Sequence, residues 1–155
     1  MYAAEQQVGR LLDRAATGAA TVDFFGSTLT LPVERRFPDL DSDPRGVDAV
    51  LALAEVRTRW PQMPACGVRA RRGASRAHYE PPATIAVPPA GRWAMRELVL
   101  CHELAHHLTV HSPGGAADPG HGRMFVEGYL SLTDIVIGAE VALLLRAGLH
   151  QAGAV

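Results

Sequence analysis

The chain has 155 residues, of which 48% are hydrophobic and 20% charged, and its formal net charge is −1. This length and composition predict one soluble globular domain over 1–155 and exclude a disordered or collagen-like chain. The near-zero charge argues against a general attraction to nucleic acid or to an anionic membrane. No run has the apolar length of a membrane span or the core of a signal peptide, so we expect a cytoplasmic protein.

The use of cysteine, lysine and asparagine indicates the redox environment of the protein and the base composition of its genome. Cys66 and Cys101 are the only cysteines, which is too few for a disulfide framework, and we expect both to be reduced. The chain contains no lysine and no asparagine. Because the codons of both residues are AT-rich, their absence indicates a GC-rich genome and not a function.

The first part of the chain predicts helices on either side of a hairpin. Apolar residues at helical spacing predict an amphipathic helix over 2–17 and a second helix over about 45–59. Between them, β-prone runs at 21–25 and 28–31 flank Gly-Ser, which predicts a short hairpin. The aspartate-rich stretch 39–43 is interpreted as a solvated turn in preference to a metal site.

The second part predicts strands followed by helices. Short segments separated by Gly and Pro predict three strands, over 67–72, 75–79 and 84–87. The apolar run 93–101 carries no Gly or Pro and predicts a buried helix that continues through 102–106 and ends before 112–115, which read Ser-Pro-Gly-Gly. A helix opening at His121 and a last helix over 139–149 follow. These elements predict an α+β fold in which a small, mostly antiparallel sheet packs on the helix of residues 102–106, with three or four further helices.

Residues 102–106 read His-Glu-Leu-Ala-His and are the most informative stretch of the chain. On a helix the two histidines lie about 40° apart, so both imidazoles can reach one cation. Glu103 lies beside the place of a metal-bound water, as in the H-E-x-x-H pattern of zinc hydrolases. Because polar groups in a buried helix are costly without a partner, we interpret His102 and His106 as zinc ligands and Glu103 as a general base. The alternative is a coincidental histidine pair on a helix surface.

A catalytic zinc site needs a third protein ligand, and His121 is the preferred candidate. It follows a loop rich in Gly, Ala and Pro that can turn the chain back. It also begins a helical stripe with Phe125, Gly128 and Leu132, which would pack on the first helix and direct His121 at the histidine pair. Glu127 lies about 120° off this stripe and is the weaker candidate.

Two further histidines of this region are predicted to face solvent. His107 and His111 form a second pair, but on a helix they point roughly 140–180° away from His102. A metzincin layout is excluded, because it requires a glycine and a histidine where this chain has Thr109 and Ser112.

The His-Glu-Leu-Ala-His stretch, followed by His-Gly-x-x-Phe at 121–125, resembles the SprT-like and WLM-type minimal zinc metallopeptidases. It looks closest to a small actinobacterial family of metallohydrolases with this layout. The resemblance covers about residues 66–148, and its specific parts are the two motifs. It implies a single zincin-like domain with zinc on His102, His106 and His121 and with Glu103 as the base. Members with extra DNA-binding modules cleave DNA-bound proteins, but this chain lacks the cysteines of a C-terminal zinc ribbon.

These observations predict a zinc-dependent hydrolase, in the first place a peptidase that cleaves extended peptide segments. Glu103 would take a proton from the zinc-bound water and deliver it to the leaving amine. The segment 83–87 is next to the motif helix in sequence and is expected to offer the open strand edge to which a peptide adds. His78, Tyr79 and Tyr129 are all candidates for stabilising the oxyanion.

Two other functions stay open. The chain could be a non-catalytic binding module in which zinc joins two helices, although such a site has no need of Glu103. It could also hydrolyse a non-peptide amide, which the sequence does not separate from a peptide.

A group of arginines raises the question of a nucleic-acid partner. They could contact an acidic peptide or phosphate, but a solvated sheet face is the preferred interpretation, so nucleic acid is not a favoured partner. The group consists of Arg69, Arg71, Arg72 and Arg76. The sequence does not indicate an oligomeric state.

Overall fold

The computed structural model describes residues 1–38, 42–71, 76–88, 94–118 and 120–153, without the side chains of 42–44. Its helices are α1 (Tyr2–Ala16), α2 (Ser42–Ala52), α3 (Ala54–Arg59), α4 (Glu97–His111), α5 (Arg123–Val136) and α6 (Ala139–Gln151), with a 3-10 turn at Gly115–Ala117. Its strands are β1 (Thr21–Phe24), β2 (Ser27–Thr30), β3 (Gly67–Ala70), β4 (His78–Glu80) and β5 (Thr84–Val87). The α+β prediction is confirmed, but the described part of the chain has five α-helices beside α4, and not three or four.

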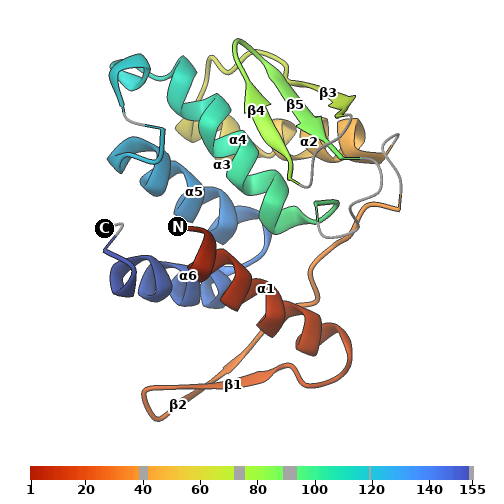
Figure 1. Cartoon of the computed structure of the whole chain (residues 1–155), viewed down its shortest axis with the longest axis vertical. Coiled ribbons are helices and arrows are strands. Elements are labelled where there is room, and N and C mark those ends of the chain that lie inside the picture. The colour runs from red at the N-terminus through yellow and green to blue at the C-terminus, as the bar shows by residue number, and fades with distance from the viewer. Residues whose placement is uncertain (39–41, 72–75, 89–93, 119, 154–155) are drawn as a thin grey trace.

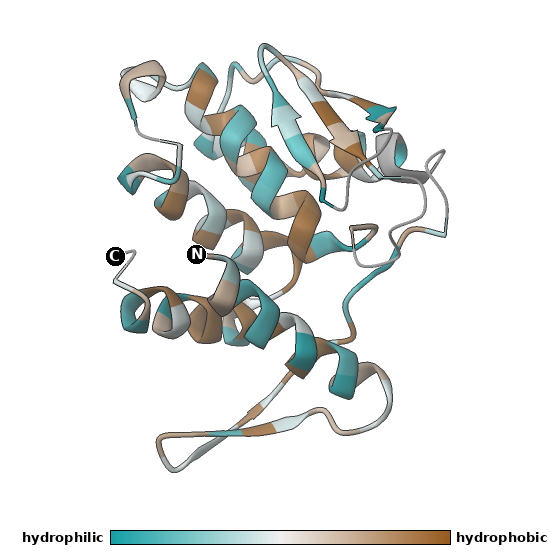
Figure 2. Ribbon diagram, in the orientation of Figure 1, coloured by the Kyte–Doolittle hydropathy of each residue, from teal (hydrophilic) through white to brown (hydrophobic). Residues whose placement is uncertain are grey.

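α4 lies between the sheet and the helices α5 and α6, whereas α2 lies on the other side against β3 (Figure 1). Strand β4 contacts α4 on one side and α5 on another, α6 packs on α5, and α1 packs on α6 and reaches α4 through Glu5. Ten of its 15 residues are buried, including both charged and apolar ones. α1, α5 and α6 each show hydrophobic and hydrophilic residues in alternation (Figure 2), as expected for helices with one buried face. The motif therefore lies in the interior of the fold, as predicted.

The three-stranded sheet has the order β3–β5–β4, with β3 parallel and β4 antiparallel to β5. It is a mixed sheet and not mostly antiparallel. The prediction that 83–87 offers an open edge is wrong, because β5 is the central strand and pairs on both sides. Proximity to α4 in sequence does not fix strand order, which depends on the connections and on the helices that cover the sheet. The edge strand that contacts α4 is β4.

β1 and β2 form the expected hairpin, but its turn lies one residue earlier than predicted. Phe24 pairs with Ser27, so Phe25 and Gly26 make the turn. Their φ angles are +51° and +82°, as a two-residue type I′ turn requires. The hairpin projects away from the helices (Figure 1).

α4 begins later than the apolar run suggests, at Glu97, because Arg96 before it is extended. The cause is the carboxylate of Glu34. It accepts hydrogen bonds from the backbone N–H of Leu98 at 2.8 Å and from the buried Arg96 guanidinium at 2.8 and 3.0 Å. This carboxylate satisfies an N–H of the first helical turn, so it serves as a cap contributed from a distant segment.

The other predicted elements differ mainly at their ends. The helix over 45–59 is divided into α2 and α3 by Leu53, which is extended, and no glycine or proline marks this break. The helices predicted over 2–17 and 139–149 agree with α1 and α6 within two residues. Asp39, Asp41, Arg72 and Ser75 lie outside the described residues. None of the helices within the described ranges has the length and apolar character needed to cross a membrane.

Candidate metal centre

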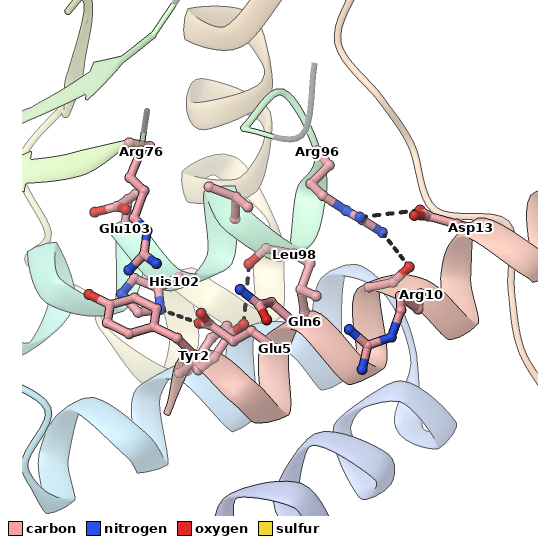
Figure 3. A pocket seen from close by; sticks show the side chains of 14 residues that line it. Tyr2, Glu5, Gln6, Arg10, Asp13, Arg76, Arg96, Leu98, His102 and Glu103 are labelled. Atoms are coloured by element: carbon pink, nitrogen blue, oxygen red, sulfur yellow. Dashed lines mark hydrogen bonds and ion pairs between the residues drawn. The ribbon is translucent and has the colours of Figure 1, made fainter. Parts of the chain in front are cut away.

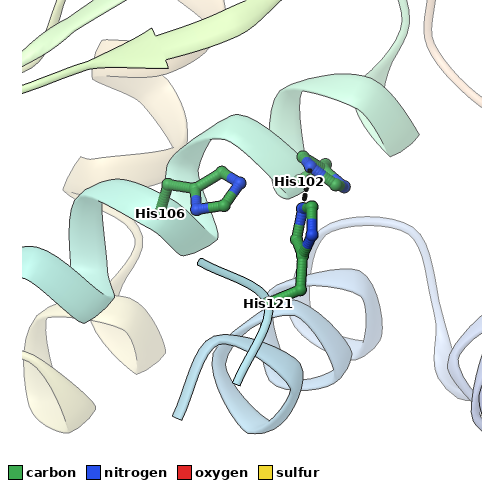
Figure 4. Close-up of side chains that lie close together, drawn as sticks. All are labelled: His102, His106 and His121. Carbon is green, nitrogen blue, oxygen red and sulfur yellow. Dashed lines mark hydrogen bonds between the residues drawn. The ribbon is translucent and has the colours of Figure 1, made fainter. Parts of the chain in front are cut away.

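His102 and His106 lie one turn apart on one face of α4, as predicted (Figure 4). Their ring centroids are 5.1 Å apart. His102 is buried and His106 is half-buried. Burial, with the neighbouring His102 and His121, lowers the pKa of His106 to about 3. The His106 imidazole is therefore neutral at physiological pH, which is the form that binds a metal.

His121 completes a group of three histidines. One nitrogen of each ring lies within 4.8 Å of the others, and the Nε2 atoms of His121 and His102 are 3.3 Å apart. Two nitrogens bound at about 2.05 Å to one tetrahedral zinc ion are separated by about 3.3–3.4 Å. The three histidines can therefore hold one metal ion.

His121 lies in the turn before α5, and not on the helix itself as predicted, because α5 begins two residues later. The Asp118 carboxylate accepts a hydrogen bond from the Phe125 backbone N–H at 3.3 Å. It also lies against Gly122, where a Cβ atom would collide with it. The fully buried Phe125 ring packs on all three histidine rings, at centroid distances of 4.3 to 5.0 Å. The predicted stripe is thus buried against α4 and positions His121.

Glu5 of α1 contacts the Nδ1 atom of His102, whereas the Nε2 atom of that ring lies near His121 (Figure 3). Its carboxylate accepts a hydrogen bond from the Nδ1–H of His102, which leaves the Nε2 lone pair facing His121. Burial, with the neighbouring Glu5 carboxylate, raises the pKa of the Tyr129 hydroxyl well above its usual range. A carboxylate in this position orients a metal-ligating histidine and raises its basicity. Nothing in the sequence signals the contact, since Glu5 precedes His102 by 97 residues.

Glu103 is 5% exposed and lies beside His102 at a cavity. Burial raises the pKa of Glu103 to about 7, against the opposing effects of His102 and of a hydrogen bond from the Tyr79 backbone N–H. A carboxyl group that titrates near neutrality can both accept and return a proton. The position and the pKa of Glu103 therefore suit a general base.

The cavity has a volume of about 480 Å³ and lies between α1 and the first half of α4 (Figure 3). One wall is the face of α1 from Tyr2 to Asp13, and the other is α4 from Leu98 to Glu103. Of the three grouped histidines, His102 lines it. A ligand in this cavity would thus lie against both Glu103 and His102 of the three-histidine group.

The prediction that His107 and His111 face solvent is wrong for His107, which is fully buried. Its Nε2 lies 2.9 Å from the Pro64 carbonyl oxygen and its Nδ1 lies 3.2 Å from the Tyr79 hydroxyl. Burial lowers the pKa of His107. His111 is partly exposed and contacts the Pro82 carbonyl oxygen at 2.6 Å. The reason is that β4 covers a side of α4 away from the three-histidine group, so α4 has no broad solvent face.

Glu127, the weaker candidate for the third ligand, is not brought to the histidine group. It is exposed on α5 and pairs with Arg123, with Nε–Oε1 at 2.8 Å. This is the surface i, i+4 pair that helical spacing allows.

The three candidates for oxyanion stabilisation have other contacts. The Tyr79 hydroxyl lies between the Pro82 carbonyl and His107, although its ring is stacked near His106 at 6.4 Å. The Tyr129 hydroxyl is buried and lies 3.4 Å from the Leu98 carbonyl oxygen. His78 Nε2 lies 3.0 Å from the Glu80 carboxylate. None of these contacts directs a hydroxyl or imidazole donor at the histidine group.

The arginine group has separate roles within the described chain. Arg69 pairs with Glu80, with Nε–Oε2 at 2.8 Å, and Arg71 donates to the Arg76 carbonyl at 2.7 Å. The Arg76 guanidinium lies over the Tyr2 ring, 4.5 Å from its centroid. These arginines do not form one continuous patch on the sheet face.

Comparison of the chain with protein-family models, with curated proteins and with solved structures finds no match. The functional argument therefore depends on the geometry of the site and on the motifs.

Proposed function

We propose that this chain is a zinc-dependent hydrolase of the H-E-x-x-H type that cleaves extended peptide segments. The observation that carries the proposal is the group of His102, His106 and His121, with Glu103 beside it at a cavity. Three imidazole donors suit zinc, and three protein ligands with an open fourth position are typical of catalytic and not of structural zinc sites. The motif resemblance to the SprT-like and WLM-type metallopeptidases supports the same proposal.

The residues of the chain have distinct roles in this mechanism. A bound zinc ion would supply an activated water and polarise the scissile carbonyl. Glu103 accepts the proton of the attacking water and transfers it to the leaving amine. The Tyr79 backbone N–H orients the Glu103 carboxylate, and Glu5 orients His102.

The position of β4 supports a peptide as the substrate. In the described chain β4 pairs with β5 alone, and the Tyr79 N–H on its other side reaches Glu103. These observations support an edge of β4 that lies beside the site and that no described strand covers. An extended peptide can add to such an edge through backbone hydrogen bonds, which would bring a peptide bond next to Glu103.

The test compares cleavage of a disordered protein by the zinc-loaded wild type and by Glu103→Gln. This substitution keeps the size of the side chain but removes the base, so we expect unchanged zinc content and a loss of about 10²–10⁴-fold in rate. Glu127→Gln, on the exposed side of α5, serves as the matched control and should cleave like the wild type. Equal rates for wild type and Glu103→Gln would remove Glu103 from the mechanism. Zinc uptake without cleavage of any member of a broad peptide library would favour a non-catalytic binding module.

A further inference from the structure

The cavity beside Glu103 extends along α1 beyond the metal-binding group, and the acidic residues of its α1 wall are already paired. The Glu5 carboxylate accepts the hydrogen bond from His102. The Asp13 carboxylate pairs with Arg36 and lies 3.2 Å from Arg96. Arg96 in turn is held by the buried Glu34. These carboxylates therefore have little capacity to neutralise further cations.

Arg10 and Arg76 differ from the other charged residues of the cavity. Both line it, and neither has a carboxylate partner within the described ranges. Arg76 lies over the ring of Tyr2, a contact that positions a guanidinium without cancelling its charge. Figure 3 places Arg76 near Glu103 and Arg10 farther along α1. The cavity thus carries two arginine charges that have no salt-bridge partner among the described residues, one near Glu103 and one farther along α1.

The rest of the lining is apolar or neutral. Ala77, Leu98 and Val99 contribute hydrocarbon, and Gln6 contributes an uncharged amide. A volume of about 480 Å³ accommodates an amino-acid side chain or a terminal residue. A lining of this kind fits a group with a short hydrocarbon stem and an anionic end.

We propose that this cavity is the specificity subsite of the enzyme and takes a carboxylate-bearing part of the substrate. Arg10 holds this carboxylate at the far end of the cavity, and Arg76 adds positive charge near Glu103, where the reacting amide lies. Guanidinium groups match carboxylates in geometry and bind them through charge-assisted hydrogen bonds. The carboxylate can come from an acidic side chain or from the free C-terminus of the peptide. This inference rests on the proposed function, because it assigns the substrate class of the same site.

The test uses monohydroxamates of dicarboxylic acids with two to six methylenes, each compared with its carboxamide analogue. The hydroxamate binds the zinc ion, and the other end reaches into the cavity. Calorimetric titration of the zinc-loaded protein should show that the acid binds about tenfold more tightly than the amide at the best chain length. The difference should decrease as salt concentration rises.

Substitutions in the arginines locate the effect. Arg10→Gln and Arg76→Gln should each reduce the preference for the acid, and the double variant should abolish it. Arg14→Gln is the matched control, because Arg14 lies one turn further along α1 and does not line the cavity. Retention of the full preference in the double variant would overturn the assignment of these arginines.

The remaining outcomes separate this inference from the proposed function. If the protein binds zinc but binds acid and amide equally at every length, the subsite is wrong and the zinc-hydrolase proposal stands. If the protein binds no zinc, both fail.

Where the acid is preferred, peptide substrates identify the source of the carboxylate. These substrates carry Glu or Gln near the cleaved bond and a free or an amidated C-terminus. If replacing Glu by Gln slows cleavage, the carboxylate belongs to an acidic side chain. If amidation of the C-terminus slows cleavage, the carboxylate is that of the C-terminus.

Discussion

His121 is the residue that turns the histidine pair of α4 into a three-ligand group. Removing one of three imidazole ligands should weaken zinc binding by about 100-fold or more, or at least roughly 3 kcal/mol. We therefore expect this loss in His121→Ala, measured by competition with a chromophoric chelator. His111→Ala is the control, because His111 contacts the Pro82 carbonyl and lies outside the group. If His121→Ala keeps full zinc affinity and Glu127→Ala loses it, the third ligand is Glu127 and not His121.

Glu5 hydrogen-bonds the Nδ1 atom of His102, while the Nε2 atom of the same ring lies next to His121. Partners of this kind typically contribute 10–100-fold to metal affinity, so Glu5→Ala should weaken zinc binding by about that factor. Nitrogen NMR of the metal-free protein should also show His102 losing its fixed Nδ1–H tautomer. Gln6→Ala changes the next residue of the same cavity wall and should leave both measurements unchanged. Unaltered affinity and tautomer in Glu5→Ala would contradict the role assigned to Glu5.

At the level of the site, the residues that the sequence could predict are those whose relation is local. Helical geometry alone places His102, Glu103 and His106 together, and a turn of chain brings His121 back to them. Glu5 could not be predicted in the same way, because its contact depends on where α1 docks. The burial of His107 was also missed, since helical angles do not reveal that the sheet covers that side of α4.

The start of α4 depends on a buried charge network contributed by another segment. Glu34 is 6% exposed and holds both Arg96 and the first turn of α4. Without the Glu34 charge, the buried Arg96 guanidinium keeps only the exposed Asp13 carboxylate as an ion-pair partner within the described chain. Breaking a buried ion pair typically costs about 3–5 kcal/mol. Glu34→Gln should therefore lower the free energy of unfolding by several kcal/mol in a urea titration. Glu127→Gln, in an exposed ion pair, should change the free energy of unfolding by less than about 1 kcal/mol. Equal effects of the two substitutions would contradict the role of Glu34 at the start of α4.

Among the elements, hydrophobic periodicity predicts whether a segment forms a helix or a strand better than it predicts which elements pack beside that segment. α1, α5 and α6 have clear amphipathic patterns and were predicted closely. The central place of β5 was missed, because a short apolar strand looks the same in sequence at an edge or in the middle of a sheet. The late start of α4 was missed for a related reason, as the Glu34 cap comes from 64 residues earlier in the chain.

In the whole molecule, contacts among Glu5, His102 and His121 connect α1, α4 and the turn before α5. Zinc binding should therefore stabilise the folded state by mass action, and its removal with a chelator should lower Tm by several degrees. The buried core extends far beyond these contacts, to Leu12, Leu145 and Leu149 among others. We therefore expect far-UV circular dichroism to retain its helical signal after chelation. Loss of that signal would favour a structural role for the metal.

The cysteines report independently on opening of the fold. Burial raises the pKa of the Cys66 thiol to about 12 and that of Cys101 well above its usual range, and neither cysteine is in a disulfide. At pH 8 both thiols stay protonated and covered, so a thiol reagent should modify them only as the protein unfolds. Chelation should accelerate modification, and adding zinc should slow it again. Rapid labelling of the native, zinc-loaded protein would contradict this arrangement of the core.

The central claim is that one zinc ion binds to three histidines and keeps its fourth position open. X-ray absorption at the zinc edge, on protein loaded with one equivalent, measures this directly. We predict three imidazole nitrogens at about 2.0–2.1 Å and one further oxygen ligand, with one imidazole lost in His121→Ala. A sulfur ligand at about 2.3 Å, or four protein ligands around the zinc ion, would contradict a catalytic centre at His102, His106 and His121.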